Sequence, residues 1–201
     1  MKKMVALLVA VLMMFGMAGN ANANILTFDD ISGQEIDTGL KLVPNGYGNL
    51  NWDSVGAANP AVAADMAGTG YSRGIVSGEW VAYNTWDSVT STTGAFDFTG
   101  AYFTSAWDTE NKIEATGYRA GEVVYSNSWT INDQTPTWIK ADFKNIDELT
   151  LNSTGDMFAM DNFTYAPAPV PEPSTYVLMG IGGLLLVSLL KKSGAGSDIP
   201  V

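Results

Sequence analysis

Carboxylates are the abundant groups in this sequence that could do chemistry, and two of them occupy strand positions suited to burial. The chain contains no histidine and no cysteine, which excludes Ser-His-Asp and Cys-His catalysis, disulfides and the commonest transition-metal ligands. Asp30 has the same strand parity as Phe28, and Asp161 has the same parity as Phe163, so each carboxylate is expected to point toward an apolar face. A buried carboxylate needs a partner, and a hard cation such as calcium would serve. The alternative is that these aspartates cap turns at strand ends.

Tryptophan is the second group that could bind a ligand. Exposed aromatic faces beside amides and carboxylates suit flat sugars, whereas buried tryptophan supplies core area. Trp52 and Trp86 are each followed by Asp-Ser at a predicted strand-to-loop transition, so we predict them as carbohydrate contacts and expect most of the others in the core. The alternative is that the repeated phrase forms two similar turns. The six tryptophans are Trp52, Trp80, Trp86, Trp107, Trp129 and Trp138.

The charge of the central part of the chain limits its partners. Between Asn24 and Ala166 there are 19 acidic and 6 basic residues, a net charge of −13. Such a body repels nucleic acid and anionic lipid surfaces, and it suits calcium, cationic partners or plain solubility. A carboxylate pair can hydrolyse glycosides, but nothing in the phrases FDF, WDTE and IDEL singles out a pair. We therefore predict a protein that is not an enzyme and does not bind nucleic acid.

The pattern of the body is that of short strands. Apolar and polar residues alternate in runs rich in Thr, Val, Tyr, Phe and Trp, bounded by Gly, Asn, Asp and Pro, and no stretch keeps a helical period. This predicts an all-β fold, a single jelly-roll-like β-sandwich domain over residues 24–166. The predicted strands are 24–28, 39–43, 48–52, 79–84, 95–107, 112–118, 122–131, 137–143, 148–152 and 157–165.

Three features interrupt the strands. Gly100 lies inside a long run and predicts a bulge or a bend. The phrase Arg119-Ala120-Gly121 predicts a short hairpin turn, because glycine can take a positive φ. Residues 57–78 are rich in glycine and alanine and predict a long surface loop, and such loops more often carry binding than packing.

The first 23 residues have the three parts of a secretory signal peptide. Lys2 and Lys3 form a positive start, residues 4–17 are apolar, and Ala21-Asn22-Ala23 is a small-x-small cleavage site. We predict cleavage by signal peptidase after Ala23. The alternative, a retained anchor, needs a longer apolar run than this one.

A second apolar segment follows the body. Residues 167–175 form a Pro-rich linker, residues 176–190 are uncharged and predict a transmembrane helix, and residues 191–201 form a short tail. The lysines at the start of this tail predict its cytoplasmic side. The body then lies on the exported face.

The C-terminal order of motif, span and basic residues resembles the PEP-CTERM sorting signal of exported bacterial proteins. The motif residues are Val170, Pro171, Glu172, Pro173, Ser174 and Thr175. This resemblance implies a substrate of exosortase, a membrane-embedded protease and transpeptidase of exopolysaccharide-producing Gram-negative bacteria. It also implies an intermediate anchored in the inner membrane, followed by release to the cell surface or the extracellular matrix of a biofilm. The alternative is a permanent C-terminal anchor.

The body carries two further resemblances. The phrases LTFDDI, GYGNLNWDSV, FDFTGAYFTSAW and FAMDNFTY are similar to phrases that recur in PEP-CTERM substrates. At the level of fold, the predicted sandwich resembles jelly-roll carbohydrate-binding modules, in which a structural calcium often ties the first strand to the last. That resemblance implies calcium ligands at Asp29, Asp30 and Asp161, with Asn162 as a carbonyl donor. The leading hypothesis is a structural or adhesive matrix protein, and the rival is a carbohydrate-binding module.

Overall fold

The secondary structure is almost entirely strand. The computed structural model of the protein describes residues 22–32, 35–85, 89–168, 180, 182 and 183. The short helices of the body are η1 (Tyr47–Asn49), η2 (Ala64–Met66) and α2 (Gly70–Arg73). The strands are β1 (Asn24–Leu26), β2 (Glu35–Asp37), β3 (Leu40–Leu42), β4 (Asn51–Asp53), β5 (Val55–Ala58), β6 (Val81–Asn84), β7 (Val89–Ser105), β8 (Asn111–Arg119), β9 (Glu122–Ile131), β10 (Thr137–Ser153) and β11 (Phe158–Pro167).

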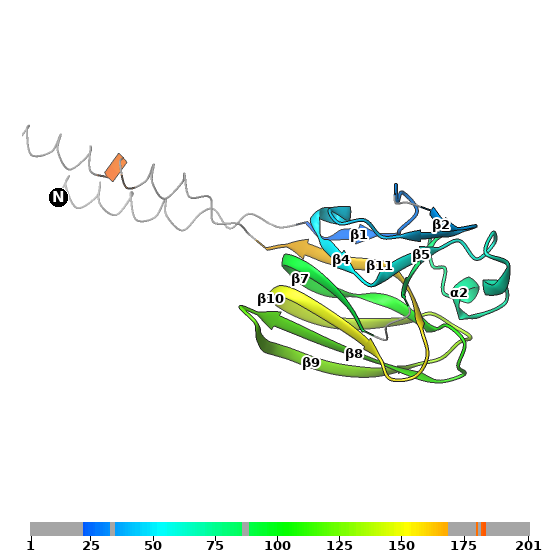
Figure 1. The fold of residues 1–201 in the computed structure, drawn as a ribbon. Coiled ribbons are helices and arrows are strands. Elements are labelled where there is room, and N and C mark those ends of the chain that lie inside the picture. The colour runs from blue at the N-terminus through cyan, green and yellow to red at the C-terminus, as the bar shows by residue number, and fades with distance from the viewer. Residues whose placement is uncertain (1–21, 33–34, 86–88, 169–179, 181, 184–201) are drawn as a thin grey trace, which may run out of the picture. The chain divides into compact units, whose positions relative to one another are not determined.

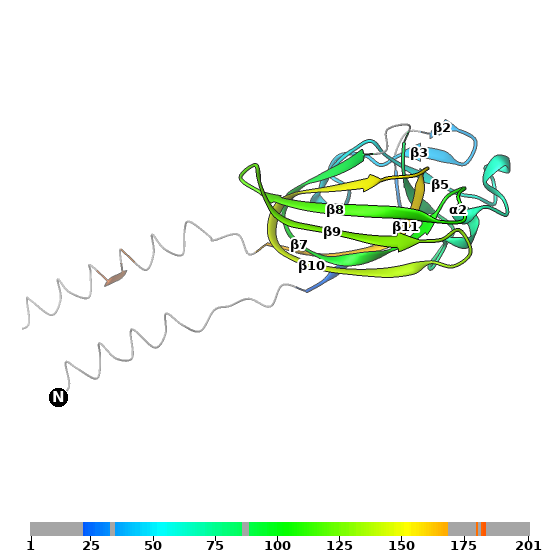
Figure 2. The same cartoon turned by 90° about the horizontal axis from the view of Figure 1, so that it is seen from below.

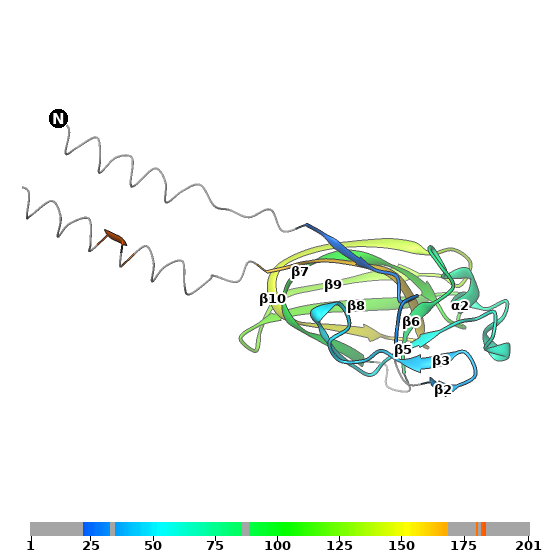
Figure 3. The ribbon, with the colours of Figure 1, turned by 90° about the horizontal axis from the view of Figure 1, so that it is seen from above.

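The strands form one antiparallel sheet that folds over into two layers (Figure 1). The order of neighbours is β2-β3-β5-β6-β11-β7-β10-β8-β9, with β1 beside β11 and β4 beside β7. Figure 2 shows the side with β8, β9 and β10, and Figure 3 shows the opposite side, with β2, β3 and β5. The predicted all-β sandwich is therefore confirmed, although continuous hydrogen bonding links its two layers.

The core between the layers is a cluster of aromatic rings. Phe163 of β11 stacks on Phe98 of β7 at 4.8 Å between ring centroids, and it meets Trp52 of β4 edge-on at 5.3 Å. Phe98 contacts Phe143 of β10, which stacks on Tyr125 of β9 at 4.8 Å. Burial of such rings is the largest favourable contribution to folding. One cluster thus holds together strands that are far apart in the sequence.

The sequence predicts a bulge or a bend at Gly100, and the structure has bulges opposite Gly100, in strands paired with β7. β10 and β11, which pair with β7 on either side of Gly100, each carry an extra residue there, and Asp142 and Asn162 have φ of 53° and 52°. A Cβ at Gly100 would lie 2.1 Å from the carbonyl oxygen of Ile139, so only glycine allows this close approach. Bulges bend strands and increase their twist. These bulges let the 17-residue strands β7 and β10 curve around the core.

Most predicted strands overlap observed ones, and two observed strands are not predicted. Residues 122–131 match β9 in full, while 137–143 and 148–152 are two parts of the single strand β10. The sequence pattern misses β2 and β5. The predicted loop 57–78 begins inside β5 and contains η2 and α2, with the rest irregular.

The first and last strands of the domain pair with each other. Asn24 lies opposite Tyr165, and Leu26 lies opposite Phe163. The chain divides into two compact units, of which the first ends at Ala168 and the second begins at Pro169. The buried core lies within the first unit, which therefore has a hydrophobic interior of its own.

The predicted hairpin turn joins β8 to β9, and it places an alanine in the left-handed region. Ala120 has φ of 51° and Gly121 has φ of 79°, the pattern of a type I′ turn. The N–H of Ala120 donates to Oδ2 of Asp147 at 2.6 Å. A left-handed alanine costs about 1–2 kcal/mol, and asparagine tolerates this conformation better.

Ala120→Asn should therefore stabilise the domain. We expect the free energy of unfolding to rise by about 0.5–1 kcal/mol, because the Asn-Gly pair suits a type I′ turn. Urea denaturation followed by tryptophan fluorescence measures the change. Gly121→Ala is the control: a Cβ there meets no heavy atom within 4 Å, so its loss of stability reports backbone strain alone. A lower midpoint for Ala120→Asn would contradict the turn assignment.

Candidate functional site

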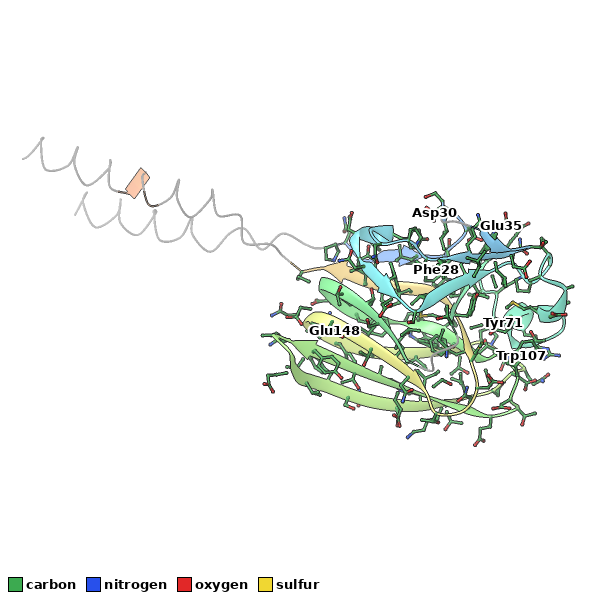
Figure 4. All side chains as sticks on the ribbon, viewed as in Figure 1. Phe28, Asp30, Glu35, Tyr71, Trp107 and Glu148 are labelled. Atoms are coloured by element: carbon green, nitrogen blue, oxygen red, sulfur yellow. The ribbon has the colours of Figure 1, made fainter. Side chains whose placement is uncertain are left out.

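A pocket of about 520 Å³ lies at the end of the domain that carries α2. Figure 4 shows two of its aromatic residues, Tyr71 and Trp107, next to each other there. We call it the Trp107 pocket. Its lining comes from β2, β3, β6, the loop with η2 and α2, and the residues beside β7 and β11: Ile36, Asp37, Thr38, Leu40, Val62, Ala63, Ala64, Asp65, Met66, Tyr71, Tyr83, Thr85, Trp107 and Met157.

The aromatic residues of the Trp107 pocket are held in place by contacts with one another and with Met157. Tyr71 is fully buried, and its ring meets Tyr83 edge-on at 5.8 Å and Trp107 edge-on at 5.5 Å. The hydroxyl of Tyr71 donates to Sδ of Met157 at 3.1 Å. Burial raises the pKa of Tyr71 well above its ordinary value, so this hydroxyl keeps its proton at neutral pH. Trp107 is 44% exposed, which leaves part of its ring available to a ligand.

The loop that carries Tyr71 is held against the end of β7. The N–H of Gly70 donates to the carbonyl of Ala106 at 2.9 Å, and a Cβ at Gly70 would lie 1.6 Å from the carbonyl oxygen of Ser105. Thr69 caps the helical turn, because its hydroxyl accepts from the N–H of Tyr71. The sequence Thr-Gly-Tyr thus fixes the ring of Tyr71 beside Trp107. That this loop serves binding more than packing stays a prediction.

The polar part of the Trp107 pocket is acidic. Asp37 and Asp65 line it together with Thr38 and Thr85, and no basic side chain does so among the described residues. The N–H of Thr38 donates to Oδ1 of Asp37 at 2.7 Å. Asp65 is exposed and has no hydrogen-bond or ion-pair partner within residues 35–85 or the other described segments. Both carboxylates therefore keep acceptor capacity for a ligand.

We predict from the sequence that Trp52 is exposed and contacts sugar, and this exposure is wrong because the side chain is buried. Trp52 is only 7% exposed, and its indole N–H donates to the carbonyl of Tyr47 at 2.9 Å. It lies opposite Thr92 in the β4–β7 ladder, on the face that packs against the core. Trp86, the other predicted sugar contact, lies outside the described residues.

The remaining tryptophans divide into core and surface groups. Trp80 and Trp129 are half-buried against the core, and Lys41 lies over the Trp80 ring at 4.6 Å. Trp107 and Trp138 are 44% and 38% exposed. Sequence reasoning missed Trp107 as a site residue, because it is followed by Asp-Thr and not by Asp-Ser, and because its neighbours in the pocket come from distant segments.

Asp161 and Asp29 both accept hydrogen bonds from the backbone of one segment of the chain. Asp161 is fully buried, and its Oδ2 accepts from the N–H groups of Val76 and Ser77 at 2.7 and 2.9 Å. Its Oδ1 accepts from the N–H of Asn162 at 2.6 Å. Oδ1 of Asp29 accepts from the N–H groups of Glu79 and Trp80 at 2.7 and 3.1 Å. These carboxylates act as acceptors for residues 76–80, which we call the clamped segment.

Asp30 does not point into the core. It is exposed, and its Oδ1 accepts from the hydroxyl of Tyr47 at 2.8 Å. The strand parity fails because β1 ends at Leu26 and Phe28 has φ of 64°, which breaks the alternation. The parity of Asp161 with Phe163 predicts its burial correctly.

Calcium at Asp29, Asp30, Asp161 and Asn162 stays a prediction that these contacts do not favour. The carboxylate oxygens described above already accept from N–H or O–H donors, and Oδ1 of Asn162 accepts from the hydroxyl of Ser77 at 2.6 Å. Within the residues that the structure describes, no group of three or more acidic side chains is placed to hold a metal ion. At Asp161 a cation would compete with three N–H groups for the carboxylate oxygens.

The predicted targeting segments lie largely outside the described residues. This applies to Ala21 of the signal cleavage site and to the motif Val170, Pro171, Glu172, Pro173, Ser174 and Thr175. Ala23 is described and exposed. Of the predicted span 176–190, only Gly180, Gly182 and Gly183 are described. In the part of the chain that the structure covers, no helix is long and apolar enough to cross a membrane.

Removing the carboxylate of Asp161 should cost much of the stability of the domain. Asp161→Ala removes the acceptor of the N–H groups of Val76, Ser77 and Asn162, so we expect a loss of about 3 kcal/mol in the free energy of unfolding. Asp161→Asn keeps one oxygen acceptor and should lose less. Burial raises the pKa of Asp161 above its ordinary 3.8, and the N–H donors partly offset this.

The raised pKa gives the same experiment a pH dependence. Protonation of Asp161 favours the folded state, so its contribution is complete below the ordinary pKa and is lost as the pH rises through the raised one. The stability difference between wild type and Asp161→Asn should shrink as the pH rises from the ordinary 3.8 through the raised pKa of Asp161. A constant difference would show that Asp161 does not titrate in this range.

A chelator tests the calcium prediction separately. If an ion binds the folded state at Asp161, EDTA should lower the melting temperature of wild type and leave that of Asp161→Ala unchanged. If hydrogen bonds to the clamped segment alone satisfy the carboxylate, EDTA should change neither curve. Differential scanning calorimetry with added calcium and with EDTA distinguishes the two results.

Comparison with known proteins yields a short sorting motif and several distant structural likenesses. No curated protein matches the chain. One solved structure is a DUF4465 family protein from Bacteroides caccae, with 11% identity and a TM-score of 0.49, covering 76% of this chain and 96% of that one. Another is TmCBM61 in complex with β-1,4-galactotriose, with 11% identity and a TM-score of 0.29, covering 62% and 94%. At these scores neither likeness assigns a function.

The C-terminal segment matches a family model. The match is described as the PEP-CTERM protein-sorting motif and covers residues 169–192. It includes the Pro-Glu-Pro sequence, the apolar run and both lysines. The chain therefore carries a PEP-CTERM sorting motif, which marks it for export and for membrane-anchored sorting toward the cell surface by an exosortase.

Proposed function

We propose that this protein is an exported, non-catalytic component of the cell surface or extracellular matrix, released from the inner membrane by an exosortase and associated with exopolysaccharide. In this proposal the signal peptide of residues 1–23 directs export, and the segment 176–190 holds the chain in the membrane until cleavage. The exosortase and signal peptidase are then its processing partners.

One observation carries the proposal. The first compact unit ends at Ala168, and the matched sorting motif begins at Pro169. A protease can act on an accessible segment without unfolding a domain, and proline with small residues favours an extended linker. The boundary thus supports processing that leaves the β-sandwich intact.

The chemistry of the domain supports a binding or structural role over catalysis. The sequence contains no histidine or cysteine. The most buried carboxylate, Asp161, accepts three backbone N–H groups in a structural arrangement. Asp37 and Asp65 in the Trp107 pocket are exposed.

Carbohydrate binding is the second candidate function. The exposed ring of Trp107 in a concave site favours it, in place of the buried Trp52. An aromatic face beside carboxylates is suited to sugar recognition. Such binding would give the processed protein a way to stay in a polysaccharide matrix.

The sorting proposal predicts the C-terminus of the mature protein. Protein recovered from the cell surface or medium should lack everything from about Ser174 onward, because the apolar span stays in the membrane. Intact-mass and C-terminal peptide mass spectrometry measures this. Replacing Pro171, Glu172 and Pro173 by alanine should leave the body in the membrane fraction.

A proline outside the motif provides the control. Pro167→Ala changes the same residue type before the matched segment and should be processed as wild type is. Recovery of surface protein that still contains Leu190 and Lys191 would contradict processing and would favour a permanent anchor.

A further inference from the structure

We propose that the Trp107 pocket binds a protonated amino-sugar unit of an extracellular polysaccharide. The polysaccharide part rests on the proposed surface location, whereas the charge of the ligand rests on the pocket itself. The pocket of about 520 Å³ is large enough for one or two sugar rings, since ligand pockets range from about 300 to 1,000 Å³.

The first requirement is a fixed apolar face. Trp107 is 44% exposed and packs edge-on against Tyr71, which is fully buried and bonded to Met157. A ligand that stacks on the indole therefore meets a ring that is already ordered, and binding orders little else. The C–H face of a pyranose ring has the flat apolar shape that such a surface accepts.

The second requirement is a set of polar side chains in the pocket that favours a positively charged ligand. Asp37 and Asp65 line the pocket with carboxylate oxygens, and the carboxylate of Asp65 has no partner in the described part of the chain. An ammonium group on the sugar would donate to them, and charge-assisted hydrogen bonds are about twice as strong as neutral ones. An ammonium close to the indole face would gain a cation–π attraction as well.

The basic residues on neighbouring elements contact partners outside the Trp107 pocket. Lys41 of β3 donates to the carbonyl of Ile31 at 3.2 Å and lies over Trp80. Arg73 of α2 forms an ion pair with Asp133 at 3.3 Å. Neither lines the pocket, so it offers no described cation to a uronate, sulfate or phosphate. The net charge of −13 between residues 24 and 166 repels such polymers further.

The test compares three oligosaccharides on the full-length protein in detergent. A glucosamine hexamer, an N-acetylglucosamine hexamer and a galacturonate hexamer differ in charge, and isothermal titration calorimetry at about pH 5.5 keeps the free amines protonated. We expect the glucosamine hexamer to bind at least about tenfold more tightly than the acetylated one, and the galacturonate hexamer not to bind. Raising the salt concentration should weaken glucosamine binding most.

Two variants separate stacking from charge. Trp107→Ala should weaken glucosamine binding about tenfold or more, and Trp107→Phe should restore part of it. Asp65→Asn should reduce the preference for glucosamine over N-acetylglucosamine and flatten the salt dependence. The matched controls are Trp138→Ala, an exposed tryptophan outside the pocket, and Asp53→Asn, an exposed aspartate on β4. Both should bind as wild type does.

Several outcomes would overturn the proposal. Equal affinity for the free and the acetylated sugar would remove the charge selection, and unchanged affinity in Trp107→Ala would place the binding elsewhere. Equally tight binding of trilysine would favour a basic peptide over a saccharide. C-terminal mass spectrometry of the wild-type protein from cells keeps the two proposals distinguishable, because absence of glucosamine binding by a normally processed wild-type protein contradicts the pocket assignment alone.

Discussion

The hydrogen bonds that Asp161 accepts determine how the segment between α2 and β6 is attached to the sheet. Its carboxylate is buried, and it takes the N–H groups of Val76 and Ser77, which belong to a segment 84 to 85 residues earlier in the chain. Asp29 accepts from the N–H groups of Glu79 and Trp80 in the same clamped segment. These four hydrogen bonds tie the segment to the two aspartates, so this pair fixes the path from α2 to β6. The Trp107 pocket depends on that path, since Tyr71 precedes the clamped segment and Tyr83 follows it.

Strands were predictable where alternation with a period of two survives, and they were missed where it does not. β9 shows clear turn residues on both sides, and its bounds follow from the sequence. In β10 the buried residues Ile139, Phe143, Ile146 and Leu149 are spaced by four, three and three, because bulges shift the side chains from face to face. That spacing divides one strand into two apparent ones. β5 has small residues and is buried throughout, so it offers no alternation to detect.

The candidate site was predictable in part for the same reason. Parity places Asp161 on the buried face, but it cannot identify partners that come from a distant loop. The same rule fails for Asp30, since the positive φ of Phe28 ends the strand pattern before it. A tryptophan followed by Asp-Ser does not separate the buried Trp52 from an exposed ring. The lining of the Trp107 pocket comes from six segments, and the sequence does not show that these segments lie close together in the fold.

The pairing and position of β11 determine how the domain would respond to a pulling force. Met157, which lines the pocket, comes immediately before β11, and the sorting segment begins two residues after Pro167. The ten residues of β11 span about 33 Å and pair with β7 on one side and with β1 and β6 on the other. A pull between a polymer held in the pocket and an attachment at the C-terminal end would run along this strand. The hydrogen bonds of β11 would then share the force in shear, and they would not open one after another as in an unzipped hairpin.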